Sequence, residues 1–289
     1  MFPTTLLLIS LSLPLTAAAQ EAPASDSHVF VGAGDIANCQ LLGGAHATAK
    51  LLDTIEGTIF TLGDHAYQSG TAREFKECYE PTWGRHKART RPVPGNHDII
   101  TGGGRAFFEY FGDAAGPDRR GYYSFNLGSW HIIALNSTAS ASGNSEQGKW
   151  LRADLAENPS DCVLAYWHVP VFSSGPHGRN LIMRDVWRIL YEAGADVILN
   201  GHDHLYERFA PQDWKGDADA ERGIRAFTVG TGGAGVYKVK LIAENSEVRD
   251  SSSYGVLKLT LSPGKYSWEF IGVNGSTRDS GSGTCTPQK

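Results

Sequence analysis

The sequence has no long run of basic residues and no internal repeat. Beyond its first residues, it also has no segment long and apolar enough to cross a membrane. Its 26 Lys and Arg are outnumbered by 31 Asp and Glu, which gives a formal net charge of -5. Nothing in this composition indicates a surface for nucleic acids or anionic membranes. We therefore expect no nucleic-acid partner, and no membrane partner for the mature protein.

The first residues have the features of an export signal. Residues 6–15 form an apolar run that is too short to span a bilayer. Ala17, Ala18 and Ala19 follow it and form the kind of small-residue site that export peptidases cut, although no Lys or Arg precedes the run. We predict a signal peptide at residues 1–19, a flexible segment at 20–27 and a secreted or periplasmic protein. A buried helix of the domain is the alternative.

Cysteine is scarce, and none of the four residues has the Cys-x-x-Cys spacing of a zinc or redox site. An even number of cysteines in an exported protein is typical of disulfides, and four cysteines allow three pairings. We favour Cys39 with Cys78, which would join loops after two early strands. Cys162 with Cys285 would then anchor the Gly/Ser-rich C-terminal tail. Free buried thiols are the alternative.

Short apolar runs alternate with amphipathic stretches through most of the chain. Strands are predicted at 29–31, 58–62, 122–127, 130–135, 163–167, 197–199, 225–229, 255–261 and 266–273, and helices at 45–52, 145–156 and 181–191. This order predicts an α/β fold in which stacked sheets are flanked by helices. We expect one domain at residues 28–289, ending in the Gly/Ser-rich tail.

Five short segments end in, or are closely followed by, residues able to bind a metal ion. The segments are VFVGAGD with Asp35, TIFTLGDHAY with Asp64 and Tyr67, RPVPGNHD with Asn96, VLAYWH with His168, and VILNGHDH with His202 and His204. In open α/β sheets, ligands collect outside the carboxyl ends of the strands, so five such loops would converge on one place. Glycines in these turns would let the backbone approach the ligand closely.

The residue types in these loops suit metal ions. Carboxylate, phenol and amide oxygens favour hard cations, and imidazoles suit iron, zinc and manganese. Asp64 has two carboxylate oxygens and could bridge two cations about 3.5–4 Å apart, a pair that can polarise a phosphoryl group. Each residue alone has an ordinary explanation, such as a helix cap, a turn or a half-buried aromatic ring. The order and placement of all five segments together predict a metal cluster.

The ordered set GD, GDxxY, GNHD, a strand-terminal His and GHxH resembles the purple acid phosphatase branch of the calcineurin-like metallophosphoesterases. The resemblance runs from Asp35 to about Arg208. It implies a sandwich of two mixed sheets flanked by helices, with a dinuclear metal centre. One ion, ferric iron in the family, would be held by Asp35, Asp64, Tyr67 and His204. A divalent ion (Zn, Mn or Fe) would be held by Asp64, Asn96, His168 and His202.

One departure from a wider pattern supports the role of Tyr67. Many dinuclear phosphoesterases begin with Asp-x-His, whereas here the position of that histidine is Ala37, which cannot bind a metal. Tyr67 would replace this ligand and points to the iron-phenolate branch. A site with two zinc or two manganese ions is the alternative.

Two further histidines are candidates for catalysis. His97 directly follows Asn96, and His177 lies on a Gly/Pro-rich loop after His168. By the resemblance, His177 matches the substrate-facing histidine of the family. Either could donate a hydrogen bond to phosphate or a proton to the leaving oxygen. The ordinary explanations are a histidine that orients a ligand for His97 and a solvated loop residue for His177. His65 also lies near the site, but we assign it no role.

These residues predict an exported phosphatase acting on small-molecule phosphate monoesters. The expected reaction is in-line attack on phosphorus by a metal-bound hydroxide. Two alternatives remain: a phosphodiesterase or nucleotide hydrolase with the same dinuclear site, and a catalytically dead secreted binding protein. The natural substrate, the pH optimum and the oligomeric state do not follow from the sequence.

Overall fold

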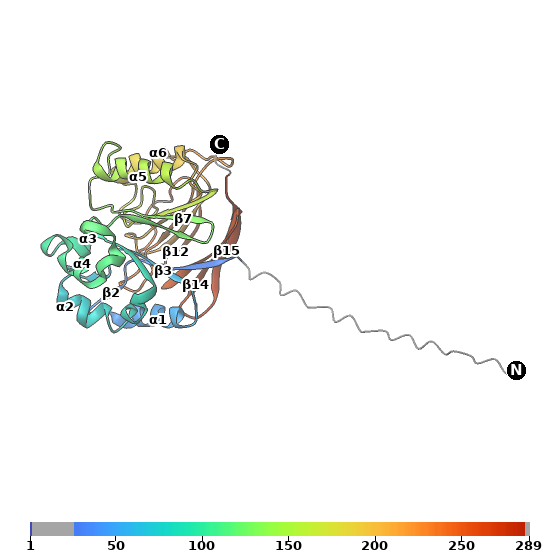
Figure 1. The fold of residues 1–289 in the computed structure, drawn as a ribbon. Coiled ribbons are helices and arrows are strands. Elements are labelled where there is room, and N and C mark those ends of the chain that lie inside the picture. Colours follow the sequence, from blue (N-terminus) through green and yellow to red (C-terminus); the bar gives the residue numbers. More distant parts are fainter. Residues whose placement is uncertain (2–25, 287–289) are drawn as a thin grey trace.

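Two large β-sheets lie at the centre of the computed structural model, which describes residue 1 and residues 26–286 (Figure 1). The predicted signal peptide and most of the segment 20–27 lie outside the described residues. Figure 1 shows α5 and α6 on one side of the sheets and α1 on the other. The fold is thus the predicted sandwich of mixed sheets flanked by helices.

The two large sheets each combine a parallel part with antiparallel strands. The first has the order β15-β14-β13-β1-β3-β5, with β1 (His28–Ala33), β3 (Thr58–Leu62), β5 (Thr90–Val93), β13 (Gly255–Ser262), β14 (Lys265–Gly272) and β15 (Thr277–Thr284). The second has the order β12-β10-β11-β9-β8-β7-β6, with β6 (Tyr123–Leu127), β7 (Trp130–Ala134), β8 (Cys162–Tyr166), β9 (Val197–Asn200), β10 (Tyr206–Phe209), β11 (Arg225–Val229) and β12 (Ser246–Asp250). A small parallel pair joins β2 (Ala37–Asn38) to β4 (Ala66–Tyr67).

The three helices that the sequence predicts occur close to their expected positions, and further short helices were not predicted. The α-helices are α1 (Leu42–Asp53), α2 (Ala72–Glu74), α3 (Asn96–Ile99), α4 (Arg105–Phe111), α5 (Glu146–Glu157) and α6 (Arg184–Glu192). Shorter helical turns are η1 (Phe75–Tyr79), η2 (Trp83–Arg89), η3 (Gly102–Gly104), η4 (Gly112–Ala115), η5 (Pro117–Arg119) and η6 (Leu181–Met183). The hydroxyl of Ser145 caps α5 by accepting from the Gly148 N–H. The helix predicted at 181–191 begins with η6 and continues as α6.

Strand β8 contributes side chains to two hydrophobic cores, one on each face of the second sheet. Successive side chains of a strand point to opposite faces. Leu164 and Tyr166 accordingly join the core that includes residues of both sheets, and Val163 and Ala165 join the second core. Helices α5 and α6 cover that second core with apolar residues such as Leu190. Every residue of β8 is buried, as expected for a strand covered on both faces.

The C-terminal segment differs from the predicted tail. Residues 277–284 form β15, which pairs antiparallel with β14. Its glycines, which favoured a tail in the sequence, lie against aromatic rings of β14. A Cβ at Gly281 would come within 2.3 Å of the Trp268 side chain, and one at Gly283 within 2.5 Å of Tyr266. The missing side chains make room for these rings, and that requirement is invisible in local composition.

The predicted disulfide pairing is confirmed. Cys39 is bonded to Cys78 and Cys162 to Cys285, with Cα–Cα distances of 5.3 Å in both pairs. The first bond ties the residue after β2 to η1. The second ties the first residue of β8 to Cys285, which directly follows the end of β15. Within the described part of the chain, no helix combines the length and apolarity required to cross a bilayer.

The carboxyl ends of the parallel strands from both sheets meet at one edge. The strands β1, β3 and β5 are parallel in the first sheet, and β7, β8, β9 and β11 are parallel in the second. Backbone hydrogen bonds connect the loops across this edge, from Gly34 N–H to the Val229 carbonyl (2.9 Å) and from Asp35 N–H to the Gly63 carbonyl (3.1 Å). The loops after β1, β3 and β11 are therefore joined at this edge.

Candidate metal centre

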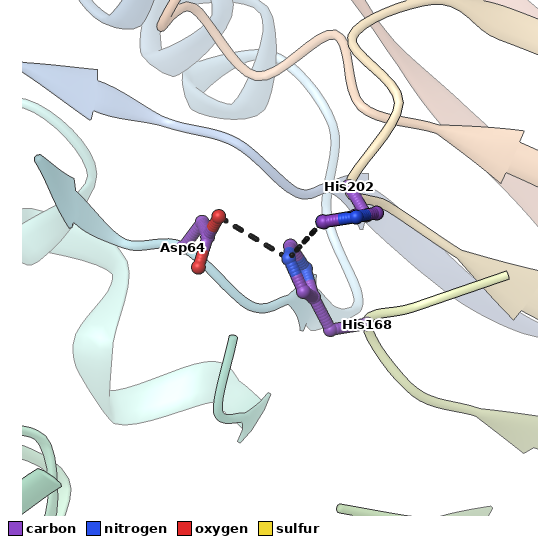
Figure 2. Close-up of side chains that lie close together, drawn as sticks. All are labelled: Asp64, His168 and His202. Atoms are coloured by element: carbon purple, nitrogen blue, oxygen red, sulfur yellow. Dashed lines mark hydrogen bonds and ion pairs between the residues drawn. The ribbon is translucent and has the colours of Figure 1, made fainter. Parts of the chain in front are cut away.

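All seven predicted ligands lie together at this edge. Each follows the carboxyl end of its strand: Asp35 after β1, Asp64 and Tyr67 after β3, Asn96 after β5, His168 after β8, and His202 and His204 after β9. Figure 2 shows Asp64, His168 and His202 pointing toward one another from three loops. One ligand atom from each of these three lies within 4.8 Å of the others.

One set of donors gathers around the Tyr67 hydroxyl. It lies 2.8 Å from Asp35 Oδ1, 3.1 Å from Asp64 Oδ2 and 3.1 Å from His204 Nε2. His204 Nε2 also approaches Asp35 Oδ1 to 3.3 Å. These four residues are the set that the sequence predicts for the first ion, and all four are buried.

A second set of donors gathers around His168 Nε2. It lies 2.9 Å from Asn96 Oδ1, 3.2 Å from His202 Nδ1 and 3.2 Å from Asp64 Oδ2. Asp64 Oδ2 therefore contacts both sets, as the predicted bridging ligand would. His168 Nδ1–H donates to the Leu62 carbonyl (2.6 Å), which leaves Nε2 free to face the centre.

The backbone orients the carboxylates through strained turns. Asp35, Asp64 and His202 have φ values of 60°, 53° and 71°, a left-handed conformation that non-glycine residues rarely adopt. The other carboxylate oxygens are held by backbone groups, since His202 N–H donates to Asp35 Oδ2 and His97 N–H to Asp64 Oδ1, both at 2.8 Å. A Cβ at Gly95 would lie 2.1 Å from Asp64 Oδ1, so only glycine permits this approach.

The charges at the centre suit a bound cation. Burial raises the pKa of Asp35, but the charge of His204 and its hydrogen bond outweigh burial and lower it overall. Burial also opposes the lowered pKa of Asp64, which results from His168. Within residues 26–286, every ion-pair partner of these two carboxylates is a histidine. Buried carboxylates without Lys or Arg, beside imidazole, phenol and amide donors, suit metal ions.

The histidines of the second set differ in charge. Burial lowers the pKa of His168, but the neighbouring Asp64 carboxylate outweighs it and raises the value to about 9. Burial and the charge of His168 lower the pKa of His202 to about 4. Proton and metal compete for the same Nε2 of His168, so metal binding there has to displace a proton.

The structure places His97 beside Tyr67 and His177 beside His202. The His97 ring lies 4.5 Å from the Tyr67 ring, and its Nδ1–H donates to the Gln68 carbonyl (2.6 Å). The His177 ring lies 4.2 Å from that of His202. His177 Nδ1–H donates to Asp203 Oδ1 (2.8 Å), so its Nε2 is available to a substrate. Their catalytic roles stay predictions.

Two buried aspartates near the centre were not identified from the sequence. Asp203 also accepts from the Ser173 hydroxyl and from the His177 N–H (3.2 Å). Asp98 accepts from the N–H groups of Gly95 (2.9 Å) and His65 (3.0 Å) and from the His65 ring (2.9 Å). Both lie inside the motifs GNHD and GHDH, so a carboxylate adjacent to a predicted ligand was the available signal.

Tyr237 is a third residue that sequence reasoning missed. Its ring is stacked on the His204 ring at 4.0 Å with an interplanar angle of 6°. Tyr237 N–H also donates to the His204 carbonyl (2.7 Å). The residue follows the glycine-rich segment 230–235 after β11, another parallel strand. The same strand-end rule that revealed the other loops would have revealed this one.

Comparisons with known proteins agree with this arrangement. The calcineurin-like phosphoesterase family model matches residues 24–206. Purple acid phosphatase 15 of Arabidopsis thaliana is 33% identical over 197 residues, which cover 55% of this chain and 37% of that protein. Purple acid phosphatase 13 of the same plant is 30% identical over 217 residues, covering 65% and 39%. The chain thus spans well under half the length of these relatives.

Solved structures share the fold. Purple acid phosphatase PPD1 from yellow lupin seeds superposes with a TM-score of 0.74 at 18% identity, covering 90% of this chain and 54% of that one. GAP50, the anchor in the inner membrane complex of Plasmodium, gives 0.68 at 16% identity, covering 91% and 90%. At these identities the likeness shows the fold alone. Because the family model covers more than half of the chain and the sandwich agrees with it, this protein belongs to the calcineurin-like phosphoesterase family.

Proposed function

We propose that this protein is an exported phosphatase that hydrolyses small-molecule phosphate monoesters at a two-metal centre. The observation that carries the proposal is the division of the seven donors into two sets that share Asp64 Oδ2. Two bound cations would polarise the phosphoryl group and supply a nucleophile at ordinary pH. The similarity to plant purple acid phosphatases supports the monoester substrate.

The residues of the chain itself position the reacting groups. The backbone N–H groups of His97 and His202 hold the outer oxygens of Asp64 and Asp35, so that Asp64 Oδ2 stays between the two sets. His177 is held through Nδ1 by Asp203, and when protonated it can donate from Nε2 to the leaving oxygen. His97 lies beside Tyr67, where it can donate a hydrogen bond to the phosphoryl group.

The proposed metals are ferric iron among Asp35, Asp64, Tyr67 and His204, and a divalent ion (Zn, Mn or Fe) in the other set. The phenol of Tyr67 supports iron, because its oxygen lies among three other donors. Metal content and a visible spectrum of the purified protein test this assignment. A phenolate-to-iron absorption band is expected in the wild type and is lost in Tyr67→Phe. Absence of the band in fully metal-loaded protein would favour two zinc or manganese ions.

Activity on p-nitrophenyl phosphate tests the function. Asp64→Ala and His202→Ala are expected to lose activity by at least about a hundredfold, since each removes a metal ligand. His46→Ala is the matched control, because His46 is exposed on α1 away from the centre. Full activity in Asp64→Ala would refute a catalytic cluster. A faster rate on bis-p-nitrophenyl phosphate would indicate a phosphodiesterase, and metal-free, inactive protein would indicate a binding protein.

Export is proposed with residues 1–19 as a cleaved signal and residues 28–289 as one functional unit. The two disulfides support an oxidising compartment, because such bonds persist outside the cytosol. Sequencing the amino terminus of protein recovered from the medium or periplasm tests the cleavage. We expect the mature chain to begin at Gln20, and recovery of an uncleaved chain from the cytoplasm would contradict export.

A further inference from the structure

A cavity of about 650 Å³ opens beside His177. Its walls come from the loop that carries His177 and from the segment 240–244, with further residues before and after Trp214. Three cationic side chains line it, those of Arg179, Lys215 and Lys240, against one acidic side chain, Glu244. This local excess of positive charge contrasts with the net charge of -5 of the whole chain.

The three cations are not engaged in ion pairs. Among the residues that the structure describes, none of them has a carboxylate oxygen within 4.0 Å. Arg179 instead donates to the Lys215 carbonyl (2.8 Å), and its guanidinium lies 5.3 Å from the centre of the Phe172 ring. Lys215 Nζ lies 5.3 Å from the Trp214 ring. Aromatic contacts position these charges without neutralising them.

A buried carboxylate holds the two walls together. Glu207 is fully buried and accepts hydrogen bonds from the Ser174 N–H (2.8 Å), the Ser174 hydroxyl and the Ser246 hydroxyl. Ser174 in turn accepts from the N–H of Lys240 (2.9 Å) through its carbonyl and from that of Ala243 (2.9 Å) through its hydroxyl. The loop of His177 and the segment of Lys240 are therefore joined before any ligand binds, which lowers the cost of binding.

An unpartnered donor is part of the same cavity wall. Gln212 is fully buried and lines the cavity. Its Oε1 accepts from Asn245 Nδ2 (3.0 Å), but its Nε2 has no hydrogen-bond partner within the described residues. A buried donor without a partner costs free energy, so this wall is not fully satisfied by the chain itself.

His177 connects this cavity to the metal centre. It lines the cavity, and its ring lies 4.2 Å from that of His202. We propose that the cavity binds a second phosphate group carried by the leaving group, so that the enzyme prefers small esters with two phosphates. This inference rests on the proposed phosphatase function and specifies the substrate class.

Matched substrates test the preference. We propose comparing kcat/KM for fructose 6-phosphate and fructose 1,6-bisphosphate with the metal-loaded wild type and with Arg179→Ala, Lys215→Ala and Lys240→Ala. The bisphosphate should be favoured about tenfold. Each variant should lower kcat/KM for the bisphosphate roughly three- to tenfold and change that for the monophosphate less than twofold. High salt should reduce the preference, because solvent ions screen exposed charges.

The matched control is Lys265→Ala, an exposed lysine at the turn between β13 and β14. It should leave both values unchanged. Equal kcat/KM for the two esters in the wild type would refute the second phosphate site while leaving the phosphatase function intact. A direct readout is calorimetric binding of propane-1,3-bisphosphonate and propylphosphonate. Should the protein hydrolyse neither these esters nor p-nitrophenyl phosphate, the phosphatase function fails. Equal affinities of wild type and Lys240→Glu for the bisphosphonate would refute the second phosphate site independently.

Discussion

At the scale of single residues, three buried aspartates outside the predicted ligand set each pair with a histidine, with different consequences. His65 pairs with Asp98 (2.9 Å), His131 with Asp154 (2.8 Å) and His177 with Asp203 (2.8 Å). All three aspartates are buried. His131 lies within β7 and pairs with a residue of α5, whereas the other two histidines lie beside predicted metal ligands. The three pairs have the same chemistry. Only the pairs of His65 and His177 lie at the strand ends, beside the predicted metal ligands, so only these two can act on the metal centre or its substrate.

The pair at His177 predicts a kinetic effect. Asp203→Asn should lower kcat about ten- to a hundredfold, because an amide no longer stabilises the protonated imidazole and can turn its N–H₂ toward the ring. Metal content should stay unchanged, since Asp203 is not among the proposed ligands. Steady-state kinetics on p-nitrophenyl phosphate across a pH series, together with metal analysis, would measure both quantities.

The matched control is Asp154→Asn, which alters a second His–Asp pair whose aspartate is likewise buried. It should lower the free energy of unfolding and leave kcat and its pH profile nearly unchanged. If both variants lost stability alike and Asp203→Asn kept the wild-type pH profile, Asp203 would be a structural residue only.

At the scale of elements, the two disulfides act at opposite ends of the strands. Cys162 begins β8, so the Cys162–Cys285 bond lies at the amino end, away from the centre. Cys39 directly follows β2, whose Asn38 pairs with Tyr67 of β4. Its partner Cys78 belongs to η1, together with Phe75, whose ring stacks on His65. The two bonds should therefore affect stability and the metal centre differently.

Replacing each pair of cysteines by serine tests this difference. The bonds span 123 and 39 residues. Loop-closure entropy then predicts losses of about 5 kcal/mol for Cys162–Cys285 and about 4 kcal/mol for Cys39–Cys78 in the free energy of unfolding. Urea unfolding would measure both. Metal occupancy should fall in the second variant and not in the first, and the reverse pattern would contradict the coupling of β2 to Tyr67.

At the scale of the whole molecule, the sequence best predicts those site residues whose position follows from the order of strands and loops along the chain. The seven donors were identifiable because each directly follows a strand, and parallel strands bring their carboxyl ends together. Asp203 and Tyr237 carried signals of the same kind, since Asp203 stands between two predicted ligands and Tyr237 follows the end of β11. Their contacts with His177 and His204 could not be predicted, because those contacts join loops that meet only in the folded chain. The strand β15 was missed because its glycines accommodate Trp268 and Tyr266, and a distant ring leaves no trace in local composition.

Asp196 connects distant parts of the chain and is the basis for a pH prediction. It precedes β9 and accepts hydrogen bonds from the N–H groups of Val163 (2.9 Å) and Thr286 (2.7 Å). Burial raises its pKa from an ordinary 3.8 to about 7, although these two hydrogen bonds act in the opposite direction. Between these pH values the folded protein holds a proton that the unfolded chain has released. The native state thus binds more protons, and its stability falls as the pH rises.

We therefore expect the free energy of unfolding of the wild type, relative to Asp196→Asn, to fall between about pH 4 and pH 7 and to level off above pH 7. The slope should approach roughly 1.4 kcal/mol per pH unit, the value for one proton. The asparagine loses one acceptor at every pH, which shifts the curve without changing its slope. Urea unfolding from pH 4 to pH 8 measures the difference, with the exposed Asp161→Asn as control. A difference independent of pH would mean that Asp196 is already ionised in the folded protein, stabilised by its two backbone donors.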